Sequence, residues 1–146
     1  MTMIPDEQML RQGAIFRKMH QFQNEGEKYR FFIVMNFDPK SDKVIILTTT
    51  TTQYQSLERR YKNATHSPLV YFHPNECSVF TRFCVINCMD LKVEGKDELL
   101  STLETTQHEF VGMIPENKLQ EILDYVIQAQ DIPPSKKSLI ISPLTF

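Results

Sequence analysis

Hydrophobic and polar positions along the chain predict a mainly β fold in its first half. Gly13 opens a short apolar segment, and we expect residues 13–20 to form the first strand. The polar, glycine-containing residues 21–28 predict a loop. Residues 29–35 (YRFFIVM) form a nearly continuous aromatic and β-branched run, which is typical of a strand buried on both faces.

The next segments predict a hairpin. Residues 36–42 (NFDPKSD) contain Pro and Asp, which favour a chain reversal. Residues 43–52 (KVIILTTTTT) are almost entirely β-forming, so they predict a strand that pairs with the preceding one. The five threonines suit a pleated surface and require no disorder. The polar residues 53–68 are expected to form a loop or a short helix.

Strand character returns after this polar region. Residues 69–73 and 78–88 are rich in β-forming side chains, and each predicts a strand. Residues 90–98 are acidic and contain a glycine, which gives no assignment. The pattern over residues 99–103 fits neither helix nor strand better than the other.

The clearest periodicity predicts one helix near the C-terminus. Apolar side chains recur at spacings of three and four residues, which places them on one helical face. They are Leu119, Ile122, Leu123, Val126 and Ile127. Pro115 suits the first turn, Glu116 complements the helix dipole there, and Pro133 with Pro134 ends the helix.

Length and composition fit a single globular domain. We interpret residues 1–146 as that domain, with a core in residues 13–130. Residues 131–146 are interpreted as a C-terminal tail, with a last strand predicted over residues 138–142. The fold class we expect is mainly β (α+β), a partly open barrel or strongly curved sheet closed by one amphipathic helix.

Charge and hydropathy limit the function classes. The net charge of −2 argues against a protein that coats DNA, although it leaves room for a local basic cleft. The chain contains no apolar run approaching the roughly 20 residues that cross a bilayer. Its first residues (MTMIPDEQMLRQ) carry acids and a proline where a signal peptide needs an apolar core. We therefore expect a cytoplasmic protein without membrane contact.

Cysteine and histidine spacing predicts no metal site. Cys77, Cys84 and Cys88 are odd in number and form no CxxC pair, so we expect buried structural thiols rather than disulfides. With His73 they match no usual zinc finger, in which ligands come in close pairs.

General acid–base chemistry by a histidine pair is a further alternative. The four histidines are His20, His66, His73 and His108. No spacing links two of them to one strand face or helix turn, and His20, at the end of the first predicted strand, is the best accessory acid or base. P-loop, GxSxG, HExxH and GxGxxG motifs are absent from the sequence, which removes the commoner nucleotide-binding and hydrolase interpretations.

Three short pieces in the first half resemble the MazF/PemK-like toxins. Residues 13–15 (GAI) resemble the opening Gly-Asp-Ile strand of that family. Residues 28–34 (KYRFFIV) resemble its strand that begins with Arg-Pro, and residues 43–50 (KVIILTTT) resemble the next strand, which ends in a Leu-Thr or Ile-Thr pair. Residues 80–86 and the segment Gly112…Leu119…Ile122 are more weakly similar to its later strand and closing helix.

The chain also departs from the family pattern. Ala14 stands where the family usually has Asp, and Phe31 stands where it has Pro after Arg. The stretch between residues 53 and 78 is longer than a minimal member needs.

The resemblance implies an SH3-like, partly open barrel that acts as a sequence-selective, metal-independent endoribonuclease. Such toxins belong to type II toxin–antitoxin systems, so the implied partners are single-stranded RNA, a second copy of the chain and a small antitoxin protein. No cofactor is implied. In this family a basic residue and a hydroxyl near adjacent strand ends promote attack of the RNA 2′-hydroxyl on the neighbouring phosphorus.

Carried over to this sequence, the basic catalytic residue is Arg30. A guanidinium can donate to two phosphoryl oxygens and remains charged at any working pH. For the hydroxyl, a gapless match from Arg30 indicates Thr50, whereas the family's Leu-Thr pair indicates Thr48. These two threonines share a strand face and both stay open as candidates. The alternative is that Arg30 only pairs with Glu25 or Glu27 at a hairpin end.

Basic side chains on both sides of this implied site are expected to hold the RNA. Those that flank it are Arg17, Lys18, His20 and Lys28. A second group, interleaved with Tyr54 and Tyr61, is Arg59, Arg60 and Lys62. Cations that neutralise phosphates and rings that stack on bases are the usual pairing for single-stranded RNA, although a solvated charged loop would have the same composition. The rival hypothesis is a non-catalytic SH3-like module that binds a protein or a nucleic acid.

Overall fold

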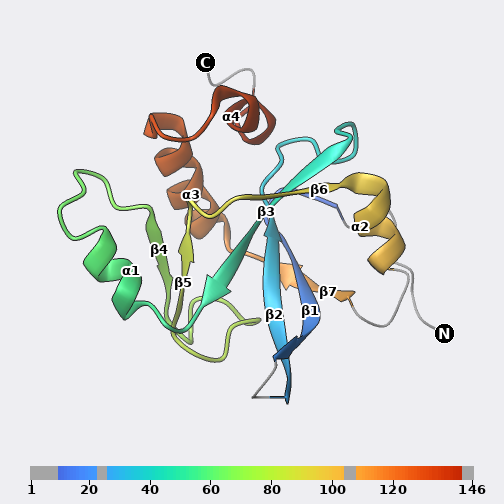
Figure 1. Ribbon diagram of the computed structural model, residues 1–146, viewed down its shortest axis with the longest axis horizontal. Helices are drawn as coiled ribbons and strands as arrows, with labels where there is room; N and C mark the ends of the chain where they lie inside the picture. The colour runs from blue at the N-terminus through green and yellow to red at the C-terminus, as the bar shows by residue number, and fades with distance from the viewer. Residues whose placement is uncertain (1–9, 23–25, 104–107, 143–146) are drawn as a thin grey trace.

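The computed structural model describes residues 10–22, 26–103 and 108–142, which form a mixed α+β fold around one antiparallel sheet (Figure 1). Its seven strands are β1 (Ala14–Phe22), β2 (Gly26–Val34), β3 (Val44–Thr51), β4 (Leu69–Phe72), β5 (Cys84–Asn87), β6 (Lys92–Gly95) and β7 (His108–Met113). The described helices are α1 (Gln55–Arg60), α2 (Lys96–Leu103), α3 (Glu116–Gln128) and α4 (Pro134–Ile140).

Strand β3 is the centre of the sheet because it pairs with three others. On one edge it pairs with β2, from Val34 opposite Leu47 to Phe32 opposite Thr49. Its first half also pairs with β6, and its last residues pair with β5, where Thr50 lies opposite Ile86. The full order is β4-β5-β3-β2-β1-β7, with β6 added beside β3. Among the described residues β4 and β7 do not pair with each other, so the sheet is not a closed barrel.

Both faces of the central strands are covered, as the continuous apolar runs predict. Side chains alternate along a strand, so Ile33 and Ile46 face one side while Val34 and Ile45 face the other. The first side packs in the larger core with α3 and α4, which lie above the sheet in Figure 1. The second side packs with Phe16 and with the helix α2. The run over residues 29–35 therefore contributes to a strand, β2, as predicted. The C-terminal end of that strand, at Ile33 and Val34, is buried on both faces.

A buried asparagine fixes the turn between β2 and β3. The Asn36 side chain is fully buried, and its Oδ1 accepts a hydrogen bond from the Ile46 backbone N–H at 2.6 Å. Its Nδ2 donates to the Val44 carbonyl at 2.9 Å and to Asp42 Oδ2 at 2.8 Å. The Asn36 side chain therefore forms hydrogen bonds with the Val44 carbonyl and the Ile46 N–H, two backbone groups at the start of β3. These bonds fix where β3 begins.

The outer strand β7 joins β1 through an irregular register. Ile15 lies opposite Gly112, whereas Phe16 lies opposite Phe110, so the register shifts between the two pairs. A Cβ atom at position 112 would lie 2.8 Å from Val79 Cγ2, a distance that side-chain carbons do not adopt. Glycine is required there because the loop before β5 packs directly against the backbone of β7.

Several sequence predictions are confirmed with shifted ends. The strands expected over residues 13–20, 43–52 and 69–73 are β1, β3 and β4, and the helix expected after Pro115 is α3. The short helix allowed within residues 53–68 is α1. The loop predicted over residues 21–28 is shorter, because β1 continues to Phe22 and β2 begins at Gly26; residues 23–25 lie outside the described part of the chain.

The strand predicted over residues 78–88 is wrong in its first half. Only Cys84–Asn87 form a strand, and the preceding residues turn, with the Phe80 N–H donating to the Cys77 carbonyl at 3.2 Å. The Phe80 ring is 3% exposed and packs edge-on against Phe31 and Phe72, with ring centres 5.3 and 5.1 Å apart. A loop thus buries the aromatic side chain that suggested a strand.

The prediction of a single helix with a strand near the C-terminus is also wrong. Residues 96–103, which gave no clear pattern, form α2, and the acidic segment before them contains β6. Residues 138–142 continue and end α4 rather than forming a strand, because Pro134 occupies the first turn of a helix. Ile140 and Ile141 enter the main core, and Gln12 Nε2 donates to the Ile140 carbonyl at 2.8 Å.

Within the described residues, no helix combines the length and apolar character required to span a bilayer.

We predict that Asn36→Ala destabilises the fold by about 1–3 kcal/mol, because the buried Ile46 N–H loses its acceptor. The free energy of unfolding is measured by urea titration. Asn117→Ala, at an exposed position of α3, is the matched control and changes stability by no more than about 0.5 kcal/mol. Equal losses in the two variants would contradict the role given to Asn36.

Candidate functional site

A groove of about 1050 Å³ lies where β2, β3, β5 and the helix α1 meet. This volume is at the upper end of the usual range for small-ligand sites. Three guanidinium groups line it, from Arg30, Arg60 and Arg82, together with a row of hydroxyls that runs from Thr49 to Thr52. Its floor contains apolar side chains, among them Phe31, Leu57 and Phe80.

The groove forms where the pairing of β3 with β2 ends and its pairing with β5, on the opposite edge, begins. The pairing of β3 with β2 runs to Phe32 and Thr49, and β3 then pairs with β5 through Thr50 and Thr51. Figure 1 shows β2 and the end of β3 diverging at this point. Arg30 lies two residues from Phe32 on the diverging part of β2, so its exposed side chain reaches the groove from one wall.

The structure places the two threonines predicted for the site differently. Thr50 is half-buried and lines the groove with Arg30. Thr48 is fully buried, lies outside the groove lining and donates its hydroxyl to the Asn87 carbonyl at 3.3 Å. Of the two, Thr50 is the one whose side chain lies beside Arg30 in the groove.

Strand alternation adds hydroxyls that the sequence comparison did not single out. Because Ile33 lies opposite Thr48 and Phe32 lies opposite Thr49, Thr50 projects from the face of Phe31. Arg30 projects from the other face, which Thr49 and Thr51 share. The side chains of Arg30, Thr49, Thr50 and Thr51 all line the groove, because it opens at the strand ends. A ligand in the groove therefore meets hydroxyls from both faces of β3.

The basic side chains predicted to hold RNA divide into two sets. Arg60, at the end of α1, lines the groove, with its guanidinium carbon 6.0 Å from the centre of the Tyr61 ring. Arg59 and Lys62 are exposed but do not line it, because neighbouring residues of a short helix point in different directions. Arg17 lies away from the groove, between β2 and β7, and forms an ion pair with Glu109. The side chains of Lys18, His20 and Lys28 lie outside the described part of the structure.

Arg82 is a lining residue that sequence reasoning missed. It lies in the loop before β5, within the range that was predicted to be strand. It is exposed, and its neighbour Phe83 anchors the loop in an aromatic cluster. An arginine beside an aromatic residue in a predicted strand carries no sequence signal that distinguishes it from an ordinary surface residue.

Aromatic packing holds the α1 wall of the groove in place. The Phe83 ring packs against Tyr54, Tyr71 and His73, with ring centres 4.8, 5.7 and 5.0 Å apart. The Tyr71 hydroxyl donates to Glu58 Oε2 of α1 at 2.9 Å. Burial, together with the Glu58 carboxylate, raises the pKa of Tyr71, so this hydroxyl keeps its proton and its bond to α1.

A second polar group lies at the turn after β5. Asn87 is 8% exposed, and its Oδ1 accepts a hydrogen bond from the Met89 N–H at 3.0 Å. Its Nδ2 donates to the Tyr61 hydroxyl oxygen at 3.3 Å. The Asp90 N–H donates to the Asn87 carbonyl at 2.9 Å. Tyr61, Asn87 and Asp90 all line the groove, and Asn87 is hydrogen-bonded to the other two.

The cysteines are buried thiols, as predicted. Burial raises the pKa of Cys84 to about 11 and that of Cys88 to about 12, and Cys77 is also buried. Thiols with such pKa values remain protonated at neutral pH and are poor nucleophiles. Among the described residues, no group of three His, Cys, Asp or Glu side chains is arranged to hold a metal ion.

The described histidines lie outside the groove. His66 is exposed on the loop after α1, and the His73 ring packs on Phe83. Neither lines the groove, so acid–base catalysis by these two has no geometric support there. The side chains of His20 and His108 lie outside the described part of the chain.

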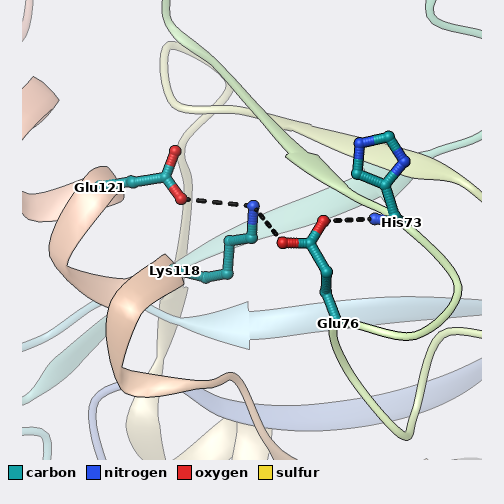
Figure 2. A network of polar contacts seen from close by, with 4 residues as sticks. All are labelled: His73, Glu76, Lys118 and Glu121. Atoms are coloured by element: carbon teal, nitrogen blue, oxygen red, sulfur yellow. Dashed lines mark hydrogen bonds and ion pairs between the residues drawn. The ribbon is translucent and has the colours of Figure 1, made fainter.

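The buried amine of Lys118 belongs to a charged cluster that connects two parts of the fold (Figure 2). The Lys118 side chain is 9% exposed, and its Nζ lies 2.9 Å from Glu76 Oε2 and 3.3 Å from Glu121 Oε2. The same Nζ lies 5.7 Å from the centre of the Phe72 ring. Glu76 Oε1 also accepts from the His73 backbone N–H at 2.9 Å, so the cluster joins α3 to the end of β4.

Lys118 stays charged in this cluster. Burial alone would lower its pKa, but hydrogen bonds to Glu76 and Glu121 outweigh burial and raise it. A permanently charged amine is no nucleophile, so the cluster stabilises the fold behind the groove rather than forming a second reactive site.

The groove thus combines three guanidinium groups with a row of hydroxyls and one exposed acid, Asp90. No protein-family model matches the chain, and a search of curated proteins finds no match. The function is therefore inferred from the groove's chemistry and from the motifs in the sequence.

We predict that Glu76→Gln weakens the fold at pH 7 and that this loss disappears in acid. The His73 N–H and Lys118 hold the pKa of Glu76 below its ordinary 4.5. The carboxylate therefore stabilises the fold above pH 4.5, and this contribution is lost as the pH falls through the lowered value. Urea midpoints from pH 7 to pH 3 measure the difference, with Glu94→Gln, outside the cluster, as control. A pH-independent difference would contradict the role of the charge.

Proposed function

We propose that this protein is a metal-independent endoribonuclease that binds and cleaves single-stranded RNA in the groove. The observation that carries the proposal is the gathering of Arg30, Arg60 and Arg82 in one groove of a chain whose net charge is −2. Three cations and one acid, Asp90, give the groove a positive balance in a chain whose net charge is negative. A phosphodiester is the ligand that forked guanidinium groups and hydroxyls bind well.

The groove supplies what transesterification requires at the phosphorus. The RNA 2′-hydroxyl attacks the adjacent phosphorus, the bond to the 5′-oxygen breaks, and a 2′,3′-cyclic phosphate forms. Arg30 donates to the phosphoryl oxygens and stabilises the charge that develops on them, while the Thr50 hydroxyl donates from the neighbouring strand β3. Because the nucleophile belongs to the substrate, DNA binds without being cleaved.

The remaining lining residues suit single-stranded RNA. Arg60 and Arg82 bind neighbouring phosphates, and Tyr61 offers a ring on which a base stacks. Unpaired bases are needed for such stacking, so a duplex is a poor substrate. Differences among bases at these contacts give the sequence selectivity.

The resemblance to MazF/PemK-like toxins supports the same proposal from the sequence. Arg30 lies in the piece that resembles the family's Arg-Pro strand, and Thr50 ends the piece that resembles its Leu-Thr strand. We extend the proposal to an SH3-like, partly open barrel, to a homodimer in the cytoplasm, and to a type II toxin whose small antitoxin covers the groove. The rival is a non-catalytic SH3-like module, in which the same groove binds RNA or a protein without cleavage.

We predict that the purified protein cleaves single-stranded RNA in the presence of EDTA and that Arg30→Ala lowers the rate by about 100- to 1000-fold. The loss follows from removing one donor to the charged phosphoryl oxygens. Cleavage of a fluorescent oligonucleotide, with its all-deoxy form as control, measures the effect. Host growth and RNA integrity on expression give the same comparison in cells.

Two neighbouring arginines provide a matched pair. Arg60→Ala weakens RNA binding because Arg60 lines the groove, whereas Arg59→Ala, one residue earlier on α1, leaves binding close to wild type.

RNA binding without cleavage by the wild-type protein would favour the non-catalytic binding module. Cleavage that survives Arg30→Ala would remove Arg30 from the mechanism.

A further inference from the structure

The Tyr61 hydroxyl is oriented so that its hydrogen is available to a ligand. The Met89 N–H needs the Asn87 Oδ1 as its acceptor, so Nδ2 of the same amide must face Tyr61. Tyr61 therefore accepts from Asn87, and its single O–H hydrogen points away from that bond. Among the described residues, no acceptor lies within hydrogen-bond distance of it. Tyr61 lines the groove, so a bound ligand can take this hydrogen bond.

Few side chains in the groove are able to exchange a proton. The arginines stay charged at any working pH, and threonine and serine hydroxyls do not ionise near neutrality. Of the described lining residues, Tyr61, Asp90 and Cys84 remain. Cys84 is 3% exposed and belongs to the main core, so it is removed from the ligand. Tyr61 is left as a donor, and the carboxylate of Asp90 is left as an acceptor.

We propose that Tyr61 and Asp90 are the proton donor and acceptor for RNA cleavage, an inference that rests on the proposed function. Asp90 takes the proton of the 2′-hydroxyl as its oxygen forms a bond to phosphorus. The bond from phosphorus to the 5′-oxygen breaks, and that oxygen takes the phenolic proton of Tyr61. The tyrosinate and the carboxylic acid then return to their starting forms by exchange with water.

Asn87 positions both groups. It donates to the Tyr61 oxygen through its side chain, and its carbonyl accepts from the Asp90 N–H. The carbonyl also accepts from Thr48, so the buried threonine fixes the turn that carries the pair.

The test uses RNA in which sulfur replaces the 5′-oxygen at the scissile bond. A thiolate leaves without being protonated, so a proton donor is needed only for the oxygen substrate. We expect Tyr61→Phe to slow cleavage of the oxygen substrate by at least about 100-fold and that of the sulfur substrate by less than about threefold. Asp90→Asn slows both, since both require removal of the 2′-hydroxyl proton. Asp97→Asn, which removes an exposed carboxylate outside the groove, leaves both rates unchanged.

The outcomes separate this inference from the function on which it rests. If the wild-type protein cleaves neither substrate, the proposed function falls and the inference falls with it. If the wild type cleaves RNA but Tyr61→Phe keeps its rate, or loses rate equally on both substrates, Tyr61 is not the donor and the nuclease function stands. If Tyr61→Phe does not fold, the exposed Asp90→Asn decides: an unchanged rate on both substrates overturns the pair.

Discussion

The position of β3 between two sets of partner strands is the constraint on which the rest of the molecule depends. Backbone groups of a buried strand must be paired on both of its edges. Strand β2 pairs with one edge as far as Thr49, while β6 near the start of β3 and β5 at Thr50 and Thr51 pair with the other edge. The divergence of β2 and β5 from this shared strand opens the groove, and the ends of these strands carry its polar side chains.

Two buried asparagines act on this strand at different points. Asn36 satisfies backbone groups at the start of β3, and Asn87 receives the Thr48 hydroxyl in its middle. A buried amide is tolerated only when its donors and acceptors are all satisfied, and that requirement excludes other registers more strongly than apolar packing does. The register of β3 in turn determines which threonines are enclosed and which face the groove.

Much of the fold was predictable because burial and local pattern agree there. The runs that become β2 and β3 are covered on both faces, and the stripe of α3 faces the main core, so periodicity identified them correctly. The errors occur where an apolar side chain is buried without regular structure, as with Phe80, or where a short apolar run ends a helix, as with Ile140. In both places the conformation depends on packing against residues distant in the sequence, which a short stretch of sequence does not reveal.

The candidate site was predictable only in part, for a similar reason. Arg30 and Thr50 came from motif likeness, and the structure puts both on one groove. Arg82 and Asn87, on either side of β5, have no local signal, and Tyr61 was expected only as a ring between basic residues. Strand alternation places Thr48 and Thr50 on the same face, but only Thr48 is covered by the turn after β5, where its hydroxyl bonds to the Asn87 carbonyl.

The two outer strands of the sheet have a consequence for behaviour at high concentration. Exposed edges recruit strands from other molecules, and long regular edges are the usual start of fibrils. Here β4 is only four residues long, and the shifted register between β1 and β7 makes the other edge uneven. A flattened, regular β7 would offer a longer template for self-association, so the irregularity beside Gly112 makes this edge a poorer one.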